Sequence, residues 1–488
     1  MRKIIASSLL TLALFGCMIG PNYKRPQVAS PQAWRFEDKE AKDVANTAWW
    51  EQLNDPVLNE LIQASIRENK DLRIAAARIE QFLGFYRSTR ANQFPQVYGG
   101  GTAGMERVTR EGAPVPLDPM VNDTFDFYNV LLSATWEIDV WGRLRRATEA
   151  ARADLLSTEE GRRTVILTLV TAVASTYIDL REFDRELEIA KRTAQSREAS
   201  YNLFKLRFEG GVISELELNQ VKSEYEDALA VIPQTEKLIS QTEHALSVLL
   251  GRNPGPIPRG QAIDQFVLPA VPAGLPSDIL ERRPDIRQAE QDLIAANARI
   301  GVARSLYFPT ISLTGTAGSA SAQLSDLFTG PAGAWSFAGQ LVTPIFTAGR
   351  IAGEVKAAEA IQQQTLNRYQ QSIQNAFREV EDGLVDQGKS RERLEAQNRQ
   401  VEALRNYARI ARLRYDEGYT SYIEVLDAER SLFNVELSYT QTQATLFKAL
   451  INLYKAMGGG WVSEADRMAT QNTGAELSGD ENMSQGVK

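Results

Sequence analysis

Two long stretches of the chain place apolar residues three or four positions apart, the spacing of a helix with one buried face. They run from Arg143 to Phe208 and from Arg350 to Tyr415, and neither contains a proline. As a helix, each would be about 100 Å long, which is wider than a globular core. The narrow apolar seam of the second stretch resembles a coiled coil and consists of Leu366, Tyr369, Ile373, Ala376, Val380 and Leu384. The pattern predicts long helices that pack side by side.

Each long helix is expected to turn back at glycine. Gly210-Gly211 follow the first stretch and Gly418 follows the second, and glycine readily adopts the left-handed conformation that ends helices. A returning helical pattern follows each turn; in the second half it contains Leu446, Leu450, Leu453 and Met457. Pro233 interrupts the first returning pattern, so we expect a kink or a local break there. Each half therefore predicts a helical hairpin, which needs neighbouring hairpins in a bundle or helical barrel to bury its seam.

Between the helices the hydrophobic period changes to two, which predicts β-strands. One side of each strand is apolar and the other polar, and aromatic residues lie near the strand ends. The predicted strands are Tyr128 to Val140, Thr310 to Ala317, Trp335 to Ile345 and a weaker, glycine-rich one from about Gln96 to Arg107. Such segments of about ten residues are typical of transmembrane barrel strands. A sheet packed on helices in a soluble domain is the alternative.

Loops near Pro114 to Asp123 and Ala322 to Ala334 would join these strands into two hairpins, one in each half. Four strands cannot close a barrel, since single membrane barrels start at about eight strands. Open sheet edges are not tolerated in lipid. If the strands span a membrane, several copies of the chain must share one barrel, and this argument does not give their number. The fold class is an α+β membrane protein.

The two halves resemble each other at an offset of 207 residues. Gly142-Arg143 recurs as Gly349-Arg350, and Leu206 to Glu209 recurs as Leu413 to Asp416. Gly211, Ser214 and Glu217 recur as Gly418, Ser421 and Glu424. This period is far longer than that of a solenoid. We therefore expect two large structural repeats.

The N-terminus predicts export and lipidation. Arg2 and Lys3 precede a short apolar run that ends in Leu14-Phe15-Gly16-Cys17, which resembles a bacterial lipobox. Cys17 is the single cysteine of the chain. We expect cleavage before Cys17 and its acylation, with palmitate among the acyl chains, whereas an ordinary signal peptide with an incidental cysteine is the alternative. Met18 at the second mature position favours the outer membrane by resemblance to bacterial lipoproteins.

Composition argues against several classes of function. The formal net charge of −8 makes a nucleic-acid partner unexpected. Gly99 to Gly104 matches a dinucleotide-binding pattern, but a strand rather than a helix is predicted there. The single histidine, His244, lies beside Glu243 on a predicted helix, where a solvent-facing or packing role is expected rather than catalysis. No nucleophile motif, phosphate-binding loop or metal-ligand cluster is found, so we expect no enzyme activity and no cofactor besides a covalent lipid on Cys17.

Several segments resemble the TolC/NodT-type outer-membrane factors of tripartite efflux systems. The resemblance covers roughly Cys17 to Trp461. It is carried by Gly20 to Pro26, Trp49-Trp50, Asn54 to Leu58, Leu275 to Ser277, Arg282 to Ile286 with Ala289-Glu290, Pro344 to Phe346 and Gly349-Arg350. It implies a homotrimer with a twelve-stranded outer-membrane β-barrel and a long periplasmic α-helical barrel. It also implies two partners, a periplasmic adaptor and an inner-membrane pump of the resistance-nodulation-division (RND) type.

The resemblance further implies a gate at the periplasmic tip, within Tyr415 to Asp427. Asp427 and Glu424 match its acidic positions, Glu217 takes the acidic position of the first tip, and Tyr415 matches a tyrosine that holds the tip closed. Thr420 replaces the basic partner of that latch. Residues three apart share a helix face, and a ring of carboxylates could bind cations. The alternative is that these carboxylates are merely solvated. Gln220 is the counterpart of Asp427, so the second half should carry most of the gate.

These inferences give six segments: a signal peptide over 1–16, a lipidated extended segment over 17–54, a first repeat over 55–260, a linker over 261–278, a second repeat over 279–462 and a polar tail over 463–488 that we expect to be disordered. The predicted function is a passive duct that exports small molecules across the bacterial outer membrane. A duct for type I protein secretion remains an alternative. A periplasmic adaptor and an acylated coiled-coil scaffold are alternatives of a different class.

Overall fold

The computed structural model describes residues 18–36, 48–109, 123–272, 274, 276–458, 461–462 and 465–466. The signal peptide and Cys17 lie outside these residues. The chain forms two compact units. The first comprises the described parts of Met1–Gln27, Arg78–Thr158 and Ala289–Tyr369, and the second those of Val28–Ala77, Glu159–Gln288 and Gln370–Lys488. Each unit draws on both halves of the sequence, so the units do not coincide with the expected repeats.

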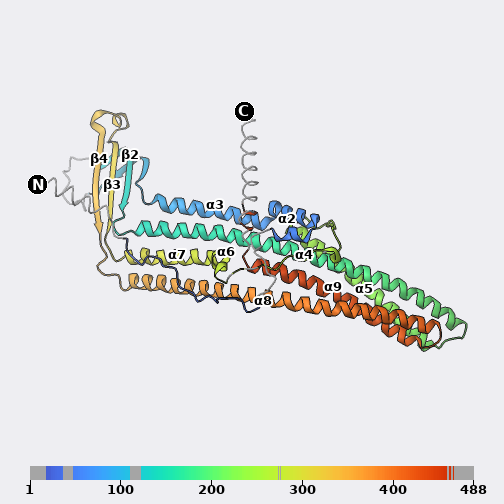
Figure 1. The fold of residues 1–488 in the computed structure, drawn as a ribbon. Helices are drawn as coiled ribbons and strands as arrows, with labels where there is room; N and C mark the ends of the chain where they lie inside the picture. The colour runs from blue at the N-terminus through green and yellow to red at the C-terminus, as the bar shows by residue number, and fades with distance from the viewer. Residues whose placement is uncertain are drawn as a thin grey trace. The chain divides into compact units, whose positions relative to one another are not determined.

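The first unit holds one antiparallel sheet in the order β1-β2-β3-β4 (Figure 1). Its strands are β1 Gln96–Arg107, β2 Thr124–Ile138, β3 Thr310–Ser321 and β4 Gly333–Val342. The four predicted strands and two hairpins are confirmed. The hairpins also pair with each other through β2 and β3, where Ser133 lies opposite Thr316. Among the described residues, β1 and β4 each pair on one side only, so the sheet has two open edges.

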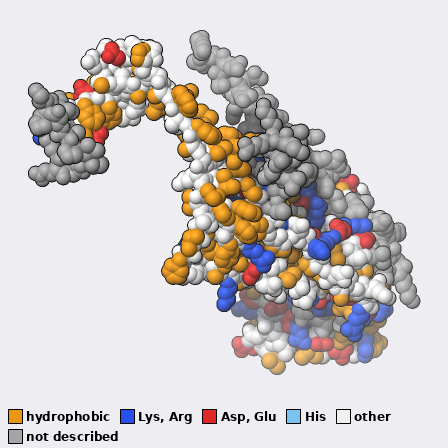
Figure 2. Space-filling view, turned by 90° about the vertical axis from the view of Figure 1, so that its left-hand side faces the viewer, with side chains coloured by type: hydrophobic (Ala, Val, Ile, Leu, Met, Phe, Trp, Pro, Cys, Tyr) orange, Lys and Arg blue, Asp and Glu red, His pale blue; other side chains and the backbone are white. Residues whose placement is uncertain are grey.

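The sheet exposes large apolar side chains. Leu132 is 60% exposed, Phe337 69% and Trp335 81%, and Figure 2 shows hydrophobic side chains gathered along the strands. A sheet in a soluble protein would bury such a face, since contiguous apolar surface in water favours association. The glycine-rich motif Gly99 to Gly104 lies inside β1. The exposure therefore fits strands that face lipid better than a sheet packed on helices.

Four long helices come in two pairs, α4 Arg143–Glu209 with α5 Glu215–Leu249, and α8 Arg350–Asp416 with α9 Tyr422–Ala456. Every bound of the first pair recurs 207 residues later in the second, the offset of the sequence motifs. The predicted long helices end one residue too early, and otherwise their bounds are correct. The local break that we allowed at Pro233 is absent, because α5 continues through that residue.

The shorter elements are η1 Trp49–Leu53, α2 Pro56–Glu68, α3 Lys70–Ala91, η2 Ile263–Gln265, η3 Pro276–Asp278, α6 Ile279–Arg282, α7 Pro284–Ser305, η4 Leu324–Asp326 and η5 Gly330–Ala332. Two expectations need correction. The segment 17–54 is not extended throughout, because its last residues form η1. Of the expected tail the structure describes only Ala465 and Asp466, which are helical rather than disordered, and Asp466 pairs with Arg162 at 3.3 Å.

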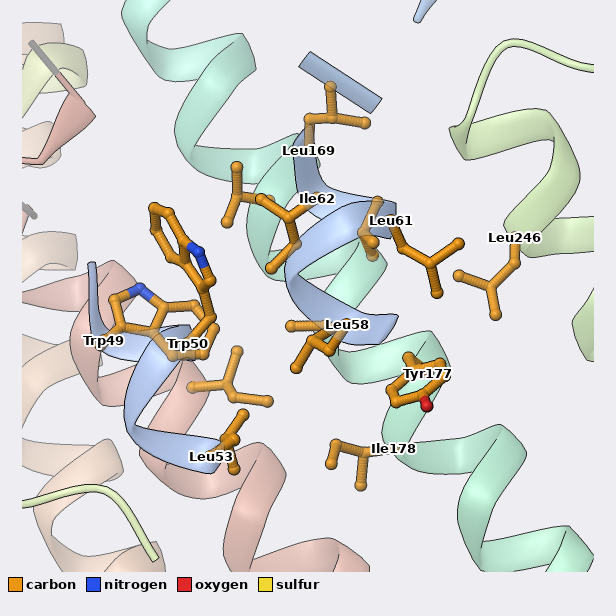
Figure 3. Close-up of a cluster of buried hydrophobic side chains, with 14 of the residues drawn as sticks. Trp49, Trp50, Leu53, Leu58, Leu61, Ile62, Leu169, Tyr177, Ile178 and Leu246 are labelled. Carbon is orange, nitrogen blue, oxygen red and sulfur yellow. The ribbon is translucent and has the colours of Figure 1, made fainter. Parts of the chain in front are cut away.

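The main hydrophobic core lies in the second unit. Figure 3 shows Trp49 and Leu53 of η1 near Leu58 of α2, with Tyr177 and Ile178 of α4 beyond. Trp49 stacks on Tyr454 with ring centroids 5.5 Å apart. Of the described helices, only α4 contains a window long and apolar enough to cross a membrane. Its apolar residues between Ile166 and Leu180 belong to this core, so burial explains their hydrophobicity.

Candidate functional site: the hairpin tips

The two helical hairpins end in turns of the same geometry, both in the second unit. Gly211 and Gly418 have φ angles of +71° and +79°, a conformation that costs glycine little. In the first turn the Val212 N–H donates to the Arg207 carbonyl at 2.8 Å, and in the second the Tyr419 N–H donates to the Arg414 carbonyl at 2.8 Å. These are the hydrogen bonds of a glycine-ended helix. The tips are therefore defined turns at the positions predicted from the sequence.

An aromatic cluster joins the two hairpins just before the turns. Phe204 of α4 packs on Tyr422 of α9 with ring centroids 4.2 Å apart, and Tyr415 of α8 lies 4.9 Å from Tyr422. The Arg207 guanidinium donates a hydrogen bond to the Tyr415 hydroxyl at 2.6 Å and lies 5.9 Å from its ring centroid. Tyr415 thus ties α8 to α4, and its role as a latch stays a prediction.

The cation of this contact is not where the family pattern placed it. Thr420 occupies that position, and within the described chain its buried hydroxyl has no hydrogen-bond partner. Arg207 of the first hairpin supplies the positive charge instead. The sequence did carry one signal for Arg207, because it recurs as Arg414 in the repeated segment. Its pairing with Tyr415 spans 208 positions, which no local pattern reveals.

The second-tip carboxylates point into exposed surroundings. Asp427 has a half-exposed side chain, and its Oδ1 accepts a hydrogen bond from Arg430 at 2.8 Å. Arg430 also lies 3.8 Å from Glu224 of α5. Glu424 is exposed, and among the described residues it forms no ion pair. Arg430 was not predicted, although a cation three residues after Asp427 lies on the same helix face.

Glu217 has a local structural role. Its carboxylate accepts hydrogen bonds from the Ser214 N–H at 2.9 Å and from the Ser214 hydroxyl at 3.0 Å, while its own N–H donates back to that hydroxyl at 3.3 Å. This capping box satisfies free N–H groups at the start of α5. Ser421, the counterpart of Ser214, makes no side-chain cap on α9. The Glu217 carboxylate is therefore engaged in hydrogen bonds at the start of α5, whereas the Glu424 carboxylate makes no such cap on α9.

Burial between the helices also changes the acidity of neighbouring groups. Burial raises the pKa of the Tyr422 hydroxyl, and it raises the pKa of the Glu429 carboxyl despite Arg412 nearby. Arg412 donates to Tyr422 at 3.4 Å and lies 3.9 Å from Glu429. Arg412 of α8 thus joins that helix to Tyr422 and Glu429 of α9. Within the described residues, no three His, Cys, Asp or Glu side chains are grouped to hold a metal ion.

Both tips expose apolar residues at matching positions. Leu206, Val212 and Leu216 are 66%, 74% and 68% exposed, and their counterparts Leu413, Tyr419 and Ile423 are 53%, 76% and 56% exposed. Three large apolar side chains on one turn form a surface that favours contact with another molecule. Each chain therefore carries the same apolar surface twice.

Known proteins resemble the chain over nearly its whole length. The family model described as outer membrane efflux protein matches residues 61–252 and 275–459. The toluene efflux pump outer membrane protein TtgC of Pseudomonas putida is 36% identical over 96% of this chain and 98% of its own length. The cation efflux system protein CusC of Escherichia coli is 36% identical over 93% and 97%. The open-state structure of the Neisseria gonorrhoeae MtrE outer membrane channel is 30% identical, with a TM-score of 0.83 over 91% of this chain and 99% of that one.

The matches agree with a fold that combines a long helical part with a few strands. They also agree with the resemblance found in the sequence, which named the same class of channel. The protein resides in the outer membrane and acts as an efflux channel that extends into the periplasm. The chain thus belongs to the outer membrane efflux protein family.

Proposed function

We propose that three copies of this chain form a duct that carries small molecules across the outer membrane for an RND-type tripartite pump. The observation that carries a barrel shared between copies is the four-stranded sheet, which has two open edges and an exposed apolar face, and the number three follows from the resemblance to TolC/NodT-type outer-membrane factors. Closing the sheet with strands of other copies would satisfy the edge hydrogen bonds that lipid cannot. Three copies would give a twelve-stranded barrel, and the hairpins would continue it as a helical barrel. The equal element bounds at an offset of 207 support two structural repeats per chain.

A periplasmic adaptor is the proposed partner at the hairpin tips, and it links the duct to an inner-membrane pump. The six exposed apolar residues of the two tips support this contact, because each tip presents the same surface to a partner helix. Burying one such side chain would contribute roughly 1.5–3 kcal/mol. Two equivalent tips per chain allow each copy to bind adaptors at two similar places. A covalent lipid on Cys17 would add anchoring to the membrane.

Asp427 and Glu424 form the proposed gate, with Tyr415 as its latch. The free carboxylate of Glu424 and the half-exposed carboxylate of Asp427 support this role, because unburied like charges would repel across a trimer axis. The Arg207 contact of Tyr415 supports a latch between the hairpins. Glu217 is left out of the gate because the capping box holds its carboxylate. The exported substrate is a small molecule, and the relatives are named for toluene and for cations.

Transport is tested by deleting the gene in a strain that expresses the cognate pump and exposing it to solvents, antibiotics, detergents and metal salts. We expect susceptibility to rise for at least one class and the intact gene to restore resistance. Unchanged susceptibility to the whole panel would contradict the proposal. Unboiled gels should show a heat-labile band near three times the mass of one chain, and a band of a single chain would refute the trimer.

The gate is tested by conductance of the purified protein in a planar lipid bilayer. Asp427→Ala with Glu424→Ala should change the conductance and its block by divalent cations, because the ring of charge is removed. Glu217→Gln is the matched control, since it retains a capping group and should behave like the unmodified protein. Equal conductance and equal cation block in all three proteins would overturn the gate assignment.

A further inference from the structure

The N-terminal segment Met18–Arg25 packs against the first unit through contacts that the proposed duct does not use. The Ile19 N–H donates to the Trp141 carbonyl at 3.1 Å, just before the start of α4. Asn22 forms a hydrogen bond with α4, and Tyr23 forms one with α7. We call residues 18–25 the strap. Residues 20–25 of the strap were identified in the sequence only as part of the resemblance to outer-membrane factors, and that resemblance gave them no structural role.

The guanidinium of Arg146 in α4 forms hydrogen bonds with the strap. Its side chain is 1% exposed, yet every nitrogen of its guanidinium has an acceptor. Nε donates to the Ile19 carbonyl at 3.2 Å, and Nη2 donates to the Gly20 carbonyl at 3.3 Å and to Asn22 Oδ1 at 2.7 Å. Nη1 donates to Glu149 at 2.7 Å. A buried guanidinium is stable only when such acceptors are present, so the strap and Arg146 depend on each other.

Helix α7 supplies the second set of contacts. Asn297 donates to the Pro21 carbonyl at 2.9 Å, and the Tyr23 hydroxyl donates to Glu290 at 3.0 Å. Glu290 also pairs with Arg25 at 3.0 Å. The strap thus bridges α4 from the first half of the sequence and α7 from the second. Its path is fixed at both ends by side chains of the same unit.

Two glycines allow the strap to cross α7 at backbone distance. Gly20 has a φ of +99°, and a Cβ there would lie 2.5 Å from the Gly301 Cα. A Cβ on Gly301 would lie 2.6 Å from the Ile19 carbonyl oxygen and 2.9 Å from the Arg146 side chain. Real Cβ atoms do not approach this closely. The crossing therefore requires glycine on both sides.

The second half of the chain has no such arrangement. The counterpart of Arg146 is Gly353, and a Cβ on Gly353 would meet nothing within 4 Å. The same holds for Gly349, whereas a Cβ on its counterpart Gly142 would lie 3.0 Å from the Met18 Cα. The repeat is therefore broken where the strap packs. This asymmetry argues that Arg146 serves the strap and not the general strand-to-helix turn.

We propose that the strap is a clasp that fixes the acyl anchor beside the first strand-to-helix junction, with Arg146 as its positioning residue. The inference rests on the proposed acylation of Cys17. Cys17 directly precedes Met18, and consecutive Cα atoms lie about 3.8 Å apart. A Cβ on Gly142 would lie 3.0 Å from the Met18 Cα, so Met18 lies beside this junction. That junction is four residues after the end of β2. The acyl chains would thus enter the membrane next to the strands, because no flexible residues separate Cys17 from the strap.

Photocrosslinking tests the position of the anchor directly. Cells are fed a palmitate analogue with a diazirine near its carboxyl end, outer membranes are irradiated, and crosslinked peptides are identified by mass spectrometry. In the unmodified protein we expect most crosslinks within the same chain to fall near residues 136–146 and 305–310. Arg146→Ala should reduce this share about fivefold or more, because a charge-assisted network of hydrogen bonds is lost. Arg350→Ala, at the corresponding junction of the second half, is the matched control and should leave the pattern unchanged.

Hydrogen–deuterium exchange of the full-length protein in detergent separates a local effect from misfolding. Arg146→Ala should speed exchange in residues 18–25 by about tenfold or more while the tip peptides exchange as before. Arg146→Lys retains the charge but not the fork of donors, so it should give an intermediate rate. Equal strap exchange in all variants, or the same crosslink pattern in Arg146→Ala, would overturn the clasp. An unacylated Cys17 in the mass spectra would instead refute the lipidation on which it rests, while the exchange data would still test the clasp.

Discussion

Glu182 of α4 is a carboxyl group buried beside α9, at 7% exposure. Burial raises its pKa to about 7, with Asp179 and Glu186 adding to the rise and Lys448 at 3.8 Å opposing it. Lys448 is mainly engaged by Asp179, at 2.6 Å. The folded protein therefore keeps the Glu182 proton up to nearly neutral pH, because burial disfavours the charged form and Lys448 offsets this only in part.

This shift predicts a pH-dependent effect of Glu182→Gln on thermal unfolding. A carboxyl whose folded pKa is raised contributes full stability below its ordinary pKa of 4.5 and loses it as pH rises through about 7. At pH 5 the variant should unfold near the midpoint of the unmodified protein. At pH 8 it should be more stable, by on the order of 2 kcal/mol. Glu188→Gln, at an exposed position on the same helix, is the control. A pH-independent effect of Glu182→Gln would contradict the argument.

The Tyr415 hydroxyl gives a second prediction. Tyr415→Phe removes the acceptor of Arg207 but leaves the aromatic packing, so it should cost about 1–2 kcal/mol of local stability at the tip. Hydrogen exchange in peptides that cover residues 411–422 should rise accordingly, by roughly tenfold. Tyr419→Phe is the control, because Tyr419 is 76% exposed and lies in the same peptides. Equal exchange in both variants would show that the Arg207 contact is unimportant.

Single residues were predictable from the sequence only where a motif marked them. Tyr415, Asp427 and Glu424 came from a resemblance, and Tyr415 lies in the expected contact region. The contacts of Arg146 and Arg207 were not predicted, because a charged residue on a helix is ordinarily interpreted as part of a solvated face. Their partners lie 124 and 208 positions away. The capping role of Glu217 was also not predicted, although its partner Ser214 is local and the S-x-x-E spacing of a capping box was already in the sequence.

Among the elements, the two returning helices differ in how they begin. Ser214 caps α5 with its side chain and Ser421 makes no such cap on α9. Ser214→Ala should therefore destabilise its tip by about 1 kcal/mol, whereas Ser421→Ala should change little. Hydrogen exchange of residues 212–222 and 419–429, measured in both variants, provides the comparison. A larger effect of Ser421→Ala than of Ser214→Ala would contradict the difference in capping.

Element bounds followed closely from the sequence where chemistry ends an element sharply. The helices stop at Gly210-Gly211 and before Gly418 because glycine ends them, and this placed both tips within one residue. Strand ends were less exact. Gly318 to Ser321 extend β3 although small side chains give no alternation, and Val140 and Ile345 continued the alternation beyond β2 and β4. Continuity through Pro233 was not predictable from the sequence, because a proline inside a helix removes one hydrogen bond and ordinarily kinks or breaks the helix.

At the scale of the whole molecule, the open edge of β4 decides between a trimer built by strand pairing and one held by helices alone. Neighbouring residues of an antiparallel strand direct their N–H groups to opposite sides. Of Phe337 and Ala338, which lie opposite Gly315 and Thr314 of β3, one therefore donates toward β3 and the other toward the open edge. Proline removes the N–H and disrupts the ladder on the affected side.

Phe337→Pro and Ala338→Pro consequently form a matched pair, tested by the fraction of trimer on unboiled gels. If strands of neighbouring copies pair, both substitutions should lower that fraction, because each breaks one of the two ladders that β4 joins. If the β4 edge pairs with nothing, one of the two should assemble as the unmodified protein does. Conductance of any trimer that forms shows whether the barrel is closed. A tolerated substitution at either residue would mean that the copies are joined by their helices, and that the exposed strands close in some other way.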